Sequence, residues 1–298
     1  MDLKIISYNG TGFNFEKANF LNFLVKSMQI DFFVLQEHMH LKANLYKIGK
    51  EFPDFDSFLL PATKKNNVVH AGRPSGGLGI FWRKSFSNNV KIVKHPDSHR
   101  VQAVILFNKF VLINTYFPTD PTVMNFDDID LLKCIQDVNW FFNEFSNHEF
   151  ILAGDLNCDF SRHSRFVNII RDFFSNNNLI SVWSNFNVDF TFSNHSVRNG
   201  NNVFSSSCID HFVMKNSLLA DVSHAQVIHL GDNLSNHDPI YLSIKIHSTS
   251  NDLFLLMICL SPHLNMIIIL INLFGVKPLR KILVITDMNL TLIWINLF

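Results

Sequence analysis

The sequence predicts an α/β (α+β) fold in which two β-sheets pack face to face and helices cover their outer faces. Short apolar, β-branched runs alternate with longer stretches of helical periodicity, a pattern typical of sheets connected by helices. Hydrophobic residues make up 47% of the 298 residues, which is enough for a large core. The length allows one large domain or two small ones.

The apolar runs predict strands because each is short, rich in β-branched and aromatic residues, and bounded by turn-forming residues. Longer periodic stretches predict helices, and the first of these places Phe20, Phe23, Leu24 and Met28 on one face. The Asn-rich stretch 199–202 predicts a loop. The predicted strands are 3–8, 31–36, 55–60, 78–83, 101–107, 110–116, 149–154, 209–214 and 239–246, and the predicted helices are 16–29, 127–146 and 163–178.

Polar side chains stand at the ends of several predicted strands. Asp155 and Asn157 follow the run 149–154, and alternation along an extended chain puts both on the same side. The other clusters contain Asn9, Glu37, Tyr116, Asp210 and His237. Together they supply hard oxygen ligands, a carboxylate that can activate water, and an imidazole. These groups suit metal-assisted hydrolysis of a phosphodiester.

The order and types of these strand-end residues resemble the endonuclease/exonuclease/phosphatase superfamily. Within it, four motifs look most like the endonuclease domain of non-LTR retrotransposons. They are Gln-Glu-His at 36–38, Gly-Arg-Pro-Ser-Gly-Gly-Leu-Gly-Ile-Phe-Trp-Arg at 72–83, Asn-Thr-Tyr-Phe-Pro-Thr-Asp at 114–120 and Ser-Arg-His-Ser-Arg-Phe at 161–166. The resemblance covers residues 1–247. It implies a four-layer sandwich of two packed β-sheets flanked by helices, and a Mg²⁺ cofactor with Mn²⁺ as the alternative.

The resemblance also implies roles for the residues on the metal side of the site. Glu37 corresponds to the leading metal ligand, and Asn9 and Asn236 match further metal-site positions. Asp155 corresponds to the residue that positions or deprotonates the attacking water, and Asn157 to the one that holds the phosphate or that water. The plain structural alternatives are a surface or helix-capping Glu and ordinary strand-end turns.

On the other side of the phosphate, the resemblance assigns His237 to stabilising the developing charge or protonating the leaving oxygen. Asp210 would hold the second ring nitrogen of this histidine and fix its tautomer. Tyr116 matches a phenol that contacts the phosphate, and Thr191 matches a smaller element of the same rim. The alternatives are a core aromatic with a satisfied hydroxyl and, with 14 histidines in the chain, an ordinary surface or core His.

The prediction of substrate-binding residues depends on local positive charge, because the net charge of the chain is zero. Arg73, Arg162 and Arg165 lie in or beside the motifs and are candidates to contact the phosphates of a DNA backbone. The alternative is that these are solvated loop charges. No stable protein partner is implied.

One position departs from the family pattern: Asn236 stands immediately before His237, where the family usually has Asp. This exchange removes a negative charge from the expected metal site and keeps only a carbonyl ligand. Asp238 points the other way along an extended chain and is a poor substitute. The departure supports a second hypothesis, in which the chain is a catalytically inactive binding module.

The C-terminal residues 248–298 form a separate hydrophobic tail. Its run 253–274 contains no Lys, Arg, Asp or Glu and is long enough to cross a bilayer, but Pro262, His263 and two Asn residues interrupt it. Membrane association is therefore disfavoured but left open. We interpret the tail as out-of-frame translation or a poorly ordered extension.

The remaining features concern the compartment. The four Cys residues show no C-x-x-C spacing, which argues against a zinc site and favours reduced thiols. The first residues lack a secretory signal, so we expect an intracellular protein, nuclear or cytoplasmic.

The function predicted from the sequence is metal-dependent hydrolysis of phosphodiesters, in particular DNA nicking by an endonuclease of retroelement origin. Two alternatives remain. One is a phosphoinositide or sphingomyelin phosphodiesterase or phosphatase of the same superfamily, because specificity lies in loops. The other is a nucleic-acid-binding relic without activity.

Overall fold

The computed structural model describes residues 2–63, 74–120, 128–198 and 201–247, together with the strand segments 254–259, 266–272, 280–286 and 289–295. The chain divides into a large unit, Asp2–Lys245, and a second unit that includes Ile246–Phe298. The division into a domain of residues 1–247 and a tail stays a prediction.

The first sheet of the large unit has six strands in the order β13-β14-β1-β2-β4-β3. Strands β1 and β2 at its centre are parallel, and the other pairs are antiparallel. The strands are β1 (Asp2–Asn9), β2 (Phe32–Gln36), β3 (Phe55–Leu60), β4 (Leu78–Arg83), β13 (Val222–Val227) and β14 (Ile240–Lys245).

The second sheet also has six strands, in the order β5-β6-β7-β8-β12-β9. Here β7 and β8 form the parallel pair at the centre, and the other pairs are antiparallel. The strands are β5 (Val90–Val93), β6 (Val101–Leu106), β7 (Phe110–Tyr116), β8 (Glu149–Asp155), β9 (Leu179–Ser181) and β12 (Asp210–Lys215).

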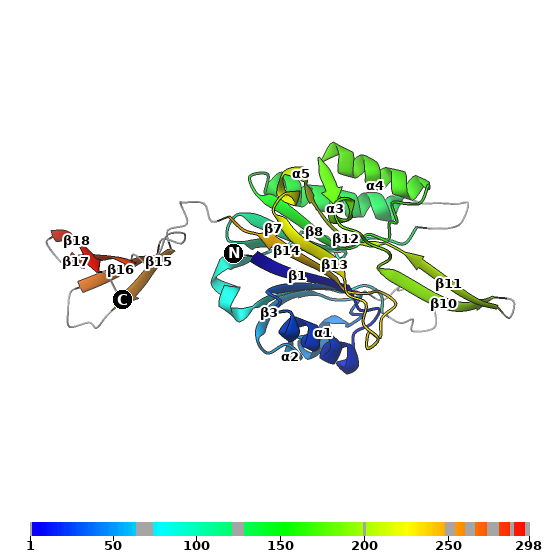
Figure 1. Ribbon diagram of the computed structural model, residues 1–298, viewed down its shortest axis with the longest axis horizontal. Helices are drawn as coiled ribbons and strands as arrows, with labels where there is room; N and C mark the ends of the chain where they lie inside the picture. The colour runs from blue at the N-terminus through cyan, green and yellow to red at the C-terminus, as the bar shows by residue number, and fades with distance from the viewer. Residues whose placement is uncertain are drawn as a thin grey trace. The chain divides into compact units, whose positions relative to one another are not determined.

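Helices cover the outer face of each sheet, so the large unit has four layers (Figure 1). Helix α1 packs on the first sheet, where Leu21 and Leu24 share a buried cluster with Ile6 and Phe33. On the second sheet, side chains of α3 and α4 share another cluster with the outward faces of β7 and β8. The helices are α1 (Phe15–Ser27), α2 (Leu45–Lys50), α3 (Ile129–Glu144), α4 (Arg165–Asn176) and α5 (Asn216–Leu219), with 3-10 turns at Lys42–Asn44, Lys84–Asn89 and Val182–Ser184.

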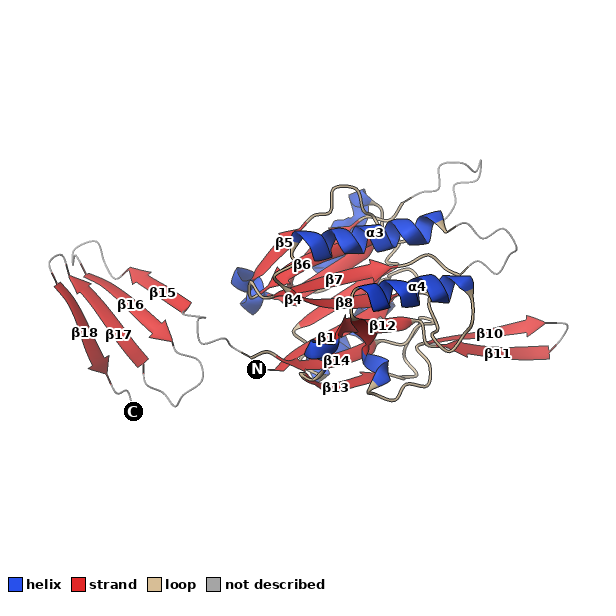
Figure 2. Ribbon diagram, turned by 90° about the horizontal axis from the view of Figure 1, so that it is seen from above, coloured by secondary structure: helices blue, strands red, loops and turns tan. Residues whose placement is uncertain are grey.

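Two strands leave the sandwich as a hairpin. Strands β10 (Phe192–Arg198) and β11 (Asn201–Ser207) pair with each other and project beyond the sheets (Figure 2). Position 201 was expected in a loop and instead begins β11, because a polar strand outside the core carries no apolar periodicity. An isolated bridge between Phe192 and His237 joins the base of the hairpin to the segment before β14.

The predicted four-layer sandwich is confirmed. All nine predicted strands and all three predicted helices are present, and their ends agree to within a few residues. The edge strands β5, β9 and β13 were missed because at most one residue of each is buried, so none carries a clear apolar pattern. Phe23 was expected on the buried face of α1 but is 62% exposed, since that face is centred on Leu21 and Leu24.

A buried polar bridge holds the two sheets in register. The Gln36 amide nitrogen donates to the Ser7 hydroxyl at 3.1 Å and to the Asn114 side-chain oxygen at 2.7 Å. Asn114 in turn donates to the Gly79 carbonyl at 2.9 Å. Because buried amides are costly unless they are satisfied, this bridge favours one offset between the sheets.

In the second unit, strands β15 to β18 form one antiparallel sheet in chain order. Within the described residues, no helix combines the length and the apolar character needed to span a membrane. The strands are β15 (Phe254–Cys259), β16 (Met266–Asn272), β17 (Arg280–Thr286) and β18 (Asn289–Ile295).

Candidate active site

Strand register brings the polar clusters to one rim. Asn9 ends β1 opposite Gln36, and Tyr116 ends β7 opposite Asp155. Asp155 also faces Asp210, the first residue of β12. Since β1 and β2 are parallel, as are β7 and β8, their carboxyl ends lie at the same edge of each sheet.

On one side of the rim, a single carboxamide connects two carboxylates. The Asn9 side-chain nitrogen donates to Glu37 Oε1 at 3.0 Å and to Asp155 Oδ2 at 2.9 Å. The backbone N–H of Thr11 donates to Asn9 Oδ1 at 2.9 Å and fixes the orientation of the amide. Residues from β1, from the end of β2 and from β8 therefore converge on one point.

The backbone around this point is unusual. Glu37 and Asn157 have φ of +50° and +49°, a left-handed conformation that costs energy in residues other than glycine. At Gly154, φ is +141° and an added Cβ would lie 2.0 Å from the Thr115 carbonyl oxygen. Only glycine therefore allows β8 to approach β7 this closely just before Asp155.

Asn157 completes a tight turn after Asp155. Its backbone N–H donates to Asp155 Oδ1 at 2.8 Å, and its side-chain nitrogen donates to the Phe117 carbonyl at 2.9 Å. The side-chain nitrogen also lies 3.4 Å from Asp155 Oδ2. With the Asn9 contact, both oxygens of the Asp155 carboxylate accept hydrogen bonds, so the side chain is held in one orientation.

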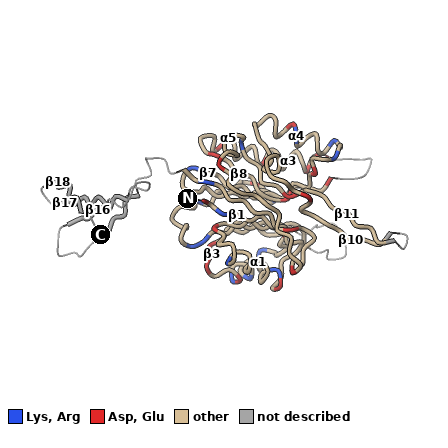
Figure 3. Tube along the Cα trace, viewed as in Figure 1, with Lys and Arg blue, Asp and Glu red and all other residues tan. Residues whose placement is uncertain are grey.

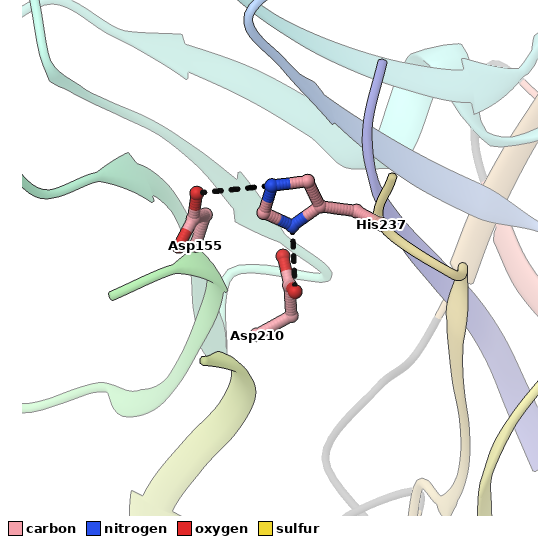
Figure 4. Close-up of side chains that lie close together, drawn as sticks. All are labelled: Asp155, Asp210 and His237. Atoms are coloured by element: carbon pink, nitrogen blue, oxygen red, sulfur yellow. Dashed lines mark hydrogen bonds and ion pairs between the residues drawn. The ribbon is translucent and has the colours of Figure 1, made fainter. Parts of the chain in front are cut away.

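On the other side of the rim, His237 is held by Asp210 (Figure 4). Its Nδ1 lies 2.9 Å from Asp210 Oδ2, and its Nε2 lies 3.9 Å from Asp155 Oδ2. The Thr191 hydroxyl donates to the same Asp210 oxygen at 2.8 Å and accepts the backbone N–H groups of Ile209 and Asp210. Because a carboxylate only accepts, Nδ1 carries a proton and Nε2 faces the site.

Burial and neighbouring charges shift the pKa values of the acids and bases at this rim. Burial, together with the charge of Asp210 and despite His237, raises the pKa of Asp155 to about 7. Burial lowers the pKa of His237, but Asp210, Asp155 and Glu37 outweigh it and raise that pKa to about 9. The imidazole is therefore a cation at neutral pH and can donate from Nε2.

Tyr116 stays a neutral hydrogen-bond donor. Burial, followed by the charges of Glu37 and Asp155, raises the pKa of its phenol well above its usual range. Arg100 stacks over the ring, with its guanidinium carbon 5.2 Å from the ring centroid. The ring is thus held between a cationic side chain and the carboxylates of the rim.

The donor set fits a divalent cation. Ligand atoms of Asp155, Asp210 and His237 all lie within 4.8 Å of one another, and the two acids are buried. Glu37 Oε1 and Asp155 Oδ2 also converge on the Asn9 amide. Buried carboxylates this close repel one another, so a hard cation with oxygen preference would relieve the repulsion.

Other residues predicted from the sequence lie apart from this cluster. Asn236 is exposed, and its backbone carbonyl accepts the Ser193 N–H at 2.9 Å. Arg162 is exposed and pairs with Asp159 at 3.6 Å, while Arg165 is exposed and pairs with Asp128. Arg73 lies outside the described residues.

Sequence reasoning missed Ser235, which connects the two sides of the rim. Its hydroxyl donates to the Asn9 carbonyl at 2.7 Å and accepts the His237 N–H at 3.2 Å. It also lies 3.1 Å from the Thr11 hydroxyl. The available signal was a serine two residues before His237, since serine hydroxyls often accept a backbone N–H two residues on.

A family model described as Endonuclease/Exonuclease/phosphatase family matches residues 7–249. The chain belongs to this family. The resemblance seen in the sequence is thereby confirmed, and the family comprises phosphodiester hydrolases, most of them metal-dependent. A search of curated proteins finds no match.

Solved structures share the fold of this family member at low sequence identity. An AP endonuclease, LMAP from Leishmania major, is 15% identical with a TM-score of 0.62, covering 83% of this chain and 88% of that one. The endonuclease domain of TRAS1, a telomere-specific non-LTR retrotransposon, is 13% identical with a TM-score of 0.58, covering 83% and 100%. The 3′ phosphatase NExo from Neisseria, bound to a product DNA hairpin, is 15% identical with a TM-score of 0.62, covering 82% and 100%.

Proposed function

We propose that this chain is a Mg²⁺-dependent endonuclease that nicks DNA, and that its activity belongs to a retroelement. The observation that carries the proposal is the placement of Asp155 beside His237. Asp155 ends β8 and His237 lies in the segment before β14; the two side chains approach to 3.9 Å, and each is oriented by a further polar residue, Asn9 and Asp210 respectively.

A bound divalent cation supplies charge neutralisation for the phosphate and the leaving oxygen. Glu37 and Asp155 are the ligands we assign to it, with Asn9 orienting both carboxylates. The metal-ligand role expected for Asn236 is weaker, because its side chain is exposed. The two assigned carboxylates, Glu37 and Asp155, offer only oxygen, which favours Mg²⁺ and admits Mn²⁺.

The chain's own residues divide the remaining chemistry. Asp155 accepts a hydrogen bond from the attacking water, and Asn157 keeps the carboxylate in place. His237 donates from Nε2 to a phosphate oxygen or to the leaving oxygen, with Asp210 holding its tautomer. Tyr116 donates its phenol hydrogen to the phosphate.

The arrangement differs from the expectation that Asp155 and His237 stand on opposite sides of the phosphate. Their facing atoms are 3.9 Å apart, which is too short for a phosphate group to lie between them. Both side chains therefore approach the phosphate from the same side, which favours donation from His237 to a non-bridging phosphate oxygen over protonation of the leaving oxygen.

DNA is the substrate class we propose because one structural neighbour is described as bound to a product DNA hairpin and another as the endonuclease domain of a non-LTR retrotransposon. In the view of Figure 3, lysines and arginines of the described residues are interspersed with acids along the large unit. The side chains of Arg162 and Arg165 are 60% and 72% exposed, and we assign both to contacts with backbone phosphates. For Arg73 we keep the same role.

The test is nicking of supercoiled plasmid by the full chain in Mg²⁺, with and without EDTA. We expect nicked circles in Mg²⁺ or Mn²⁺ and none in EDTA. Phosphoinositide and sphingomyelin are assayed in parallel with equal enzyme. Turnover of either lipid without nicking would refute the DNA assignment.

One observation favours a second candidate, an inactive nucleic-acid-binding relic. Asn236 has lost the carboxylate usual in the family, and its side chain is exposed. Metal-independent DNA binding with no cleavage in any divalent cation would support the relic.

We also propose that residues 1–247 carry the site and that 248–298 are read out of frame, which sequencing of the transcript tests.

A further inference from the structure

A second histidine near the rim lies between two carboxylates. His229 stands in the loop between β13 and β14, and its Nδ1 lies 2.7 Å from Asp238 Oδ2. Its Nε2 lies 3.0 Å from Asp189 Oδ1. The ring of Phe190 packs against it, with centroids 4.7 Å apart. The contacts on its two nitrogens thus come from segments that are distant in sequence.

The protonation state of His229 decides whether both contacts are hydrogen bonds. Neutral imidazole has one N–H, whereas carboxylates only accept, so two such bonds require the imidazolium. Asp189, just before β10, and Asp238, just before β14, are the titratable groups that face the ring. Burial lowers the pKa of His229, but these two carboxylates raise it above its usual value.

One end of this bridge leads to the catalytic histidine. Asp238 follows His237, and its second oxygen accepts from the Asn233 amide at 2.8 Å. The same amide nitrogen donates to the His237 carbonyl at 2.8 Å, and Tyr8 donates to Asn233 Oδ1 at 2.9 Å. Asp238 is therefore part of the hydrogen-bonded turn that places His237 over the rim.

The other end leads to the partner of the catalytic histidine. Asp189 lies two residues before Thr191, whose hydroxyl donates to the Asp210 carboxylate. The Thr191 carbonyl accepts the Asp238 N–H at 2.8 Å. The bridge thus connects the segment that orients Asp210 with the turn that carries His237.

We propose that His229, bridging Asp189 and Asp238, is a positioning residue for His237 and makes the geometry of the His237–Asp210 pair depend on pH. When His229 is protonated, the two segments are tied together. When it loses its proton, one of the two bonds is lost and the turn carrying His237 gains freedom. This inference rests on the proposed function only for its effect on rate.

The bridge itself is tested without any substrate. The imidazole of His229 is titrated by NMR in the full chain, in wild type and in Asp189→Asn and Asp238→Asn. We expect a pKa above 6.5 in wild type, the ordinary value, and a lower one in both variants. A wild-type value at or below 6.5, or no change in either variant, overturns the proposal whether or not the chain cleaves DNA.

The effect on rate is tested with His229→Gln from about pH 5 to about pH 9, a range that spans histidine titration. We expect wild type to exceed the variant about two- to fivefold on the acid side, the scale of exposed ion pairs, with the ratio approaching one on the alkaline side. A ratio that is the same at every pH shows a merely structural role and overturns the proposal.

Two matched controls accompany these measurements. Asp232→Asn removes an exposed carboxylate from the same loop, and His224→Gln removes an exposed histidine from β13. Both are expected to keep the pH profile of wild type. Should His229→Gln fail to fold, Asp189→Asn breaks the same bridge at a side chain that is 64% exposed.

Discussion

His237 and His229 each have carboxylate partners, and their surroundings give them different tasks. His237 and Asp210 are buried, with side chains 7% and 3% exposed, whereas His229 is 39% exposed and its partner Asp189 is 64% exposed. Charges attract more strongly where water is excluded. His237 in the buried pair therefore keeps its proton over most of the pH range, whereas the more exposed His229 gains or loses its proton within that range.

The first way to break the comparison is to delete the buried histidine. His237→Ala removes the cation that donates to the phosphate, and we expect nicking to fall about 10³-fold, within the range for acid–base groups. Single-turnover nicking in Mg²⁺ measures this. His229→Gln under the same conditions should lose only a few fold. Equal losses in the two variants would contradict the distinction.

The second prediction concerns how the free energy of unfolding changes with pH when EDTA is present. The pKa of His237 is about 9 in the folded chain against 6.5 when unfolded, so its stabilisation is full below 6.5 and is lost as pH rises through about 9. Asp155, raised from 3.8 to about 7, acts in the same direction at lower pH.

Denaturant unfolding at about pH 6 and pH 9 should therefore show a loss of up to about 3 kcal/mol at the higher pH. His237→Gln is the matched variant and should show a smaller loss. A free energy of unfolding that rises from the lower pH to the higher pH would show that His237 is not held as a buried cation.

The third prediction changes Asp210, the buried partner of His237. Asp210→Asn keeps the size of the side chain but removes its charge, so the pKa of His237 should fall from about 9 toward its ordinary value. We expect nicking at neutral pH to drop at least about tenfold, because the tautomer is less well held. NMR titration of His237 gives the direct reading, and an unchanged pKa would exclude Asp210 as its partner.

The smallest effect is expected at the exposed bridge. Asp189→Asn should reduce the free energy of unfolding by less than about 1 kcal/mol, as for other solvent-screened pairs. Asp232→Asn provides the baseline in the same loop. A loss at Asp189 as large as that at Asp210 would mean that the bridge is a main support of the fold.

The sequence predicted the sandwich because its central strands are apolar on both faces, as in β7 and β8. It missed the hairpin β10–β11, whose Ser- and Asn-rich strands pair outside the core. For the same reason the edge strand β13 carried too weak a pattern. Burial on two faces leaves a pattern in the sequence, whereas pairing at an edge leaves little.

The residues of the site also divide into those that the sequence could predict and those that it could not. Asp155 and Asn9 could be proposed because each ends an apolar strand. The bridge could not, because His229 lies 40 residues from Asp189 in sequence and stands in none of the motifs. The metal-ligand role that the motif predicted for Asn236 stays a proposal, and the side chain of this residue is exposed.

The most direct test of the central claim compares wild type with Asp155→Asn in the plasmid-nicking assay, using saturating Mg²⁺ and full-length protein. The variant keeps the shape of the side chain and removes the charge that orients water. We expect wild type to nick and the variant to be at least about 10²-fold slower, the lower limit for a general base. Equal rates would show that Asp155 and His237 do not form the catalytic centre.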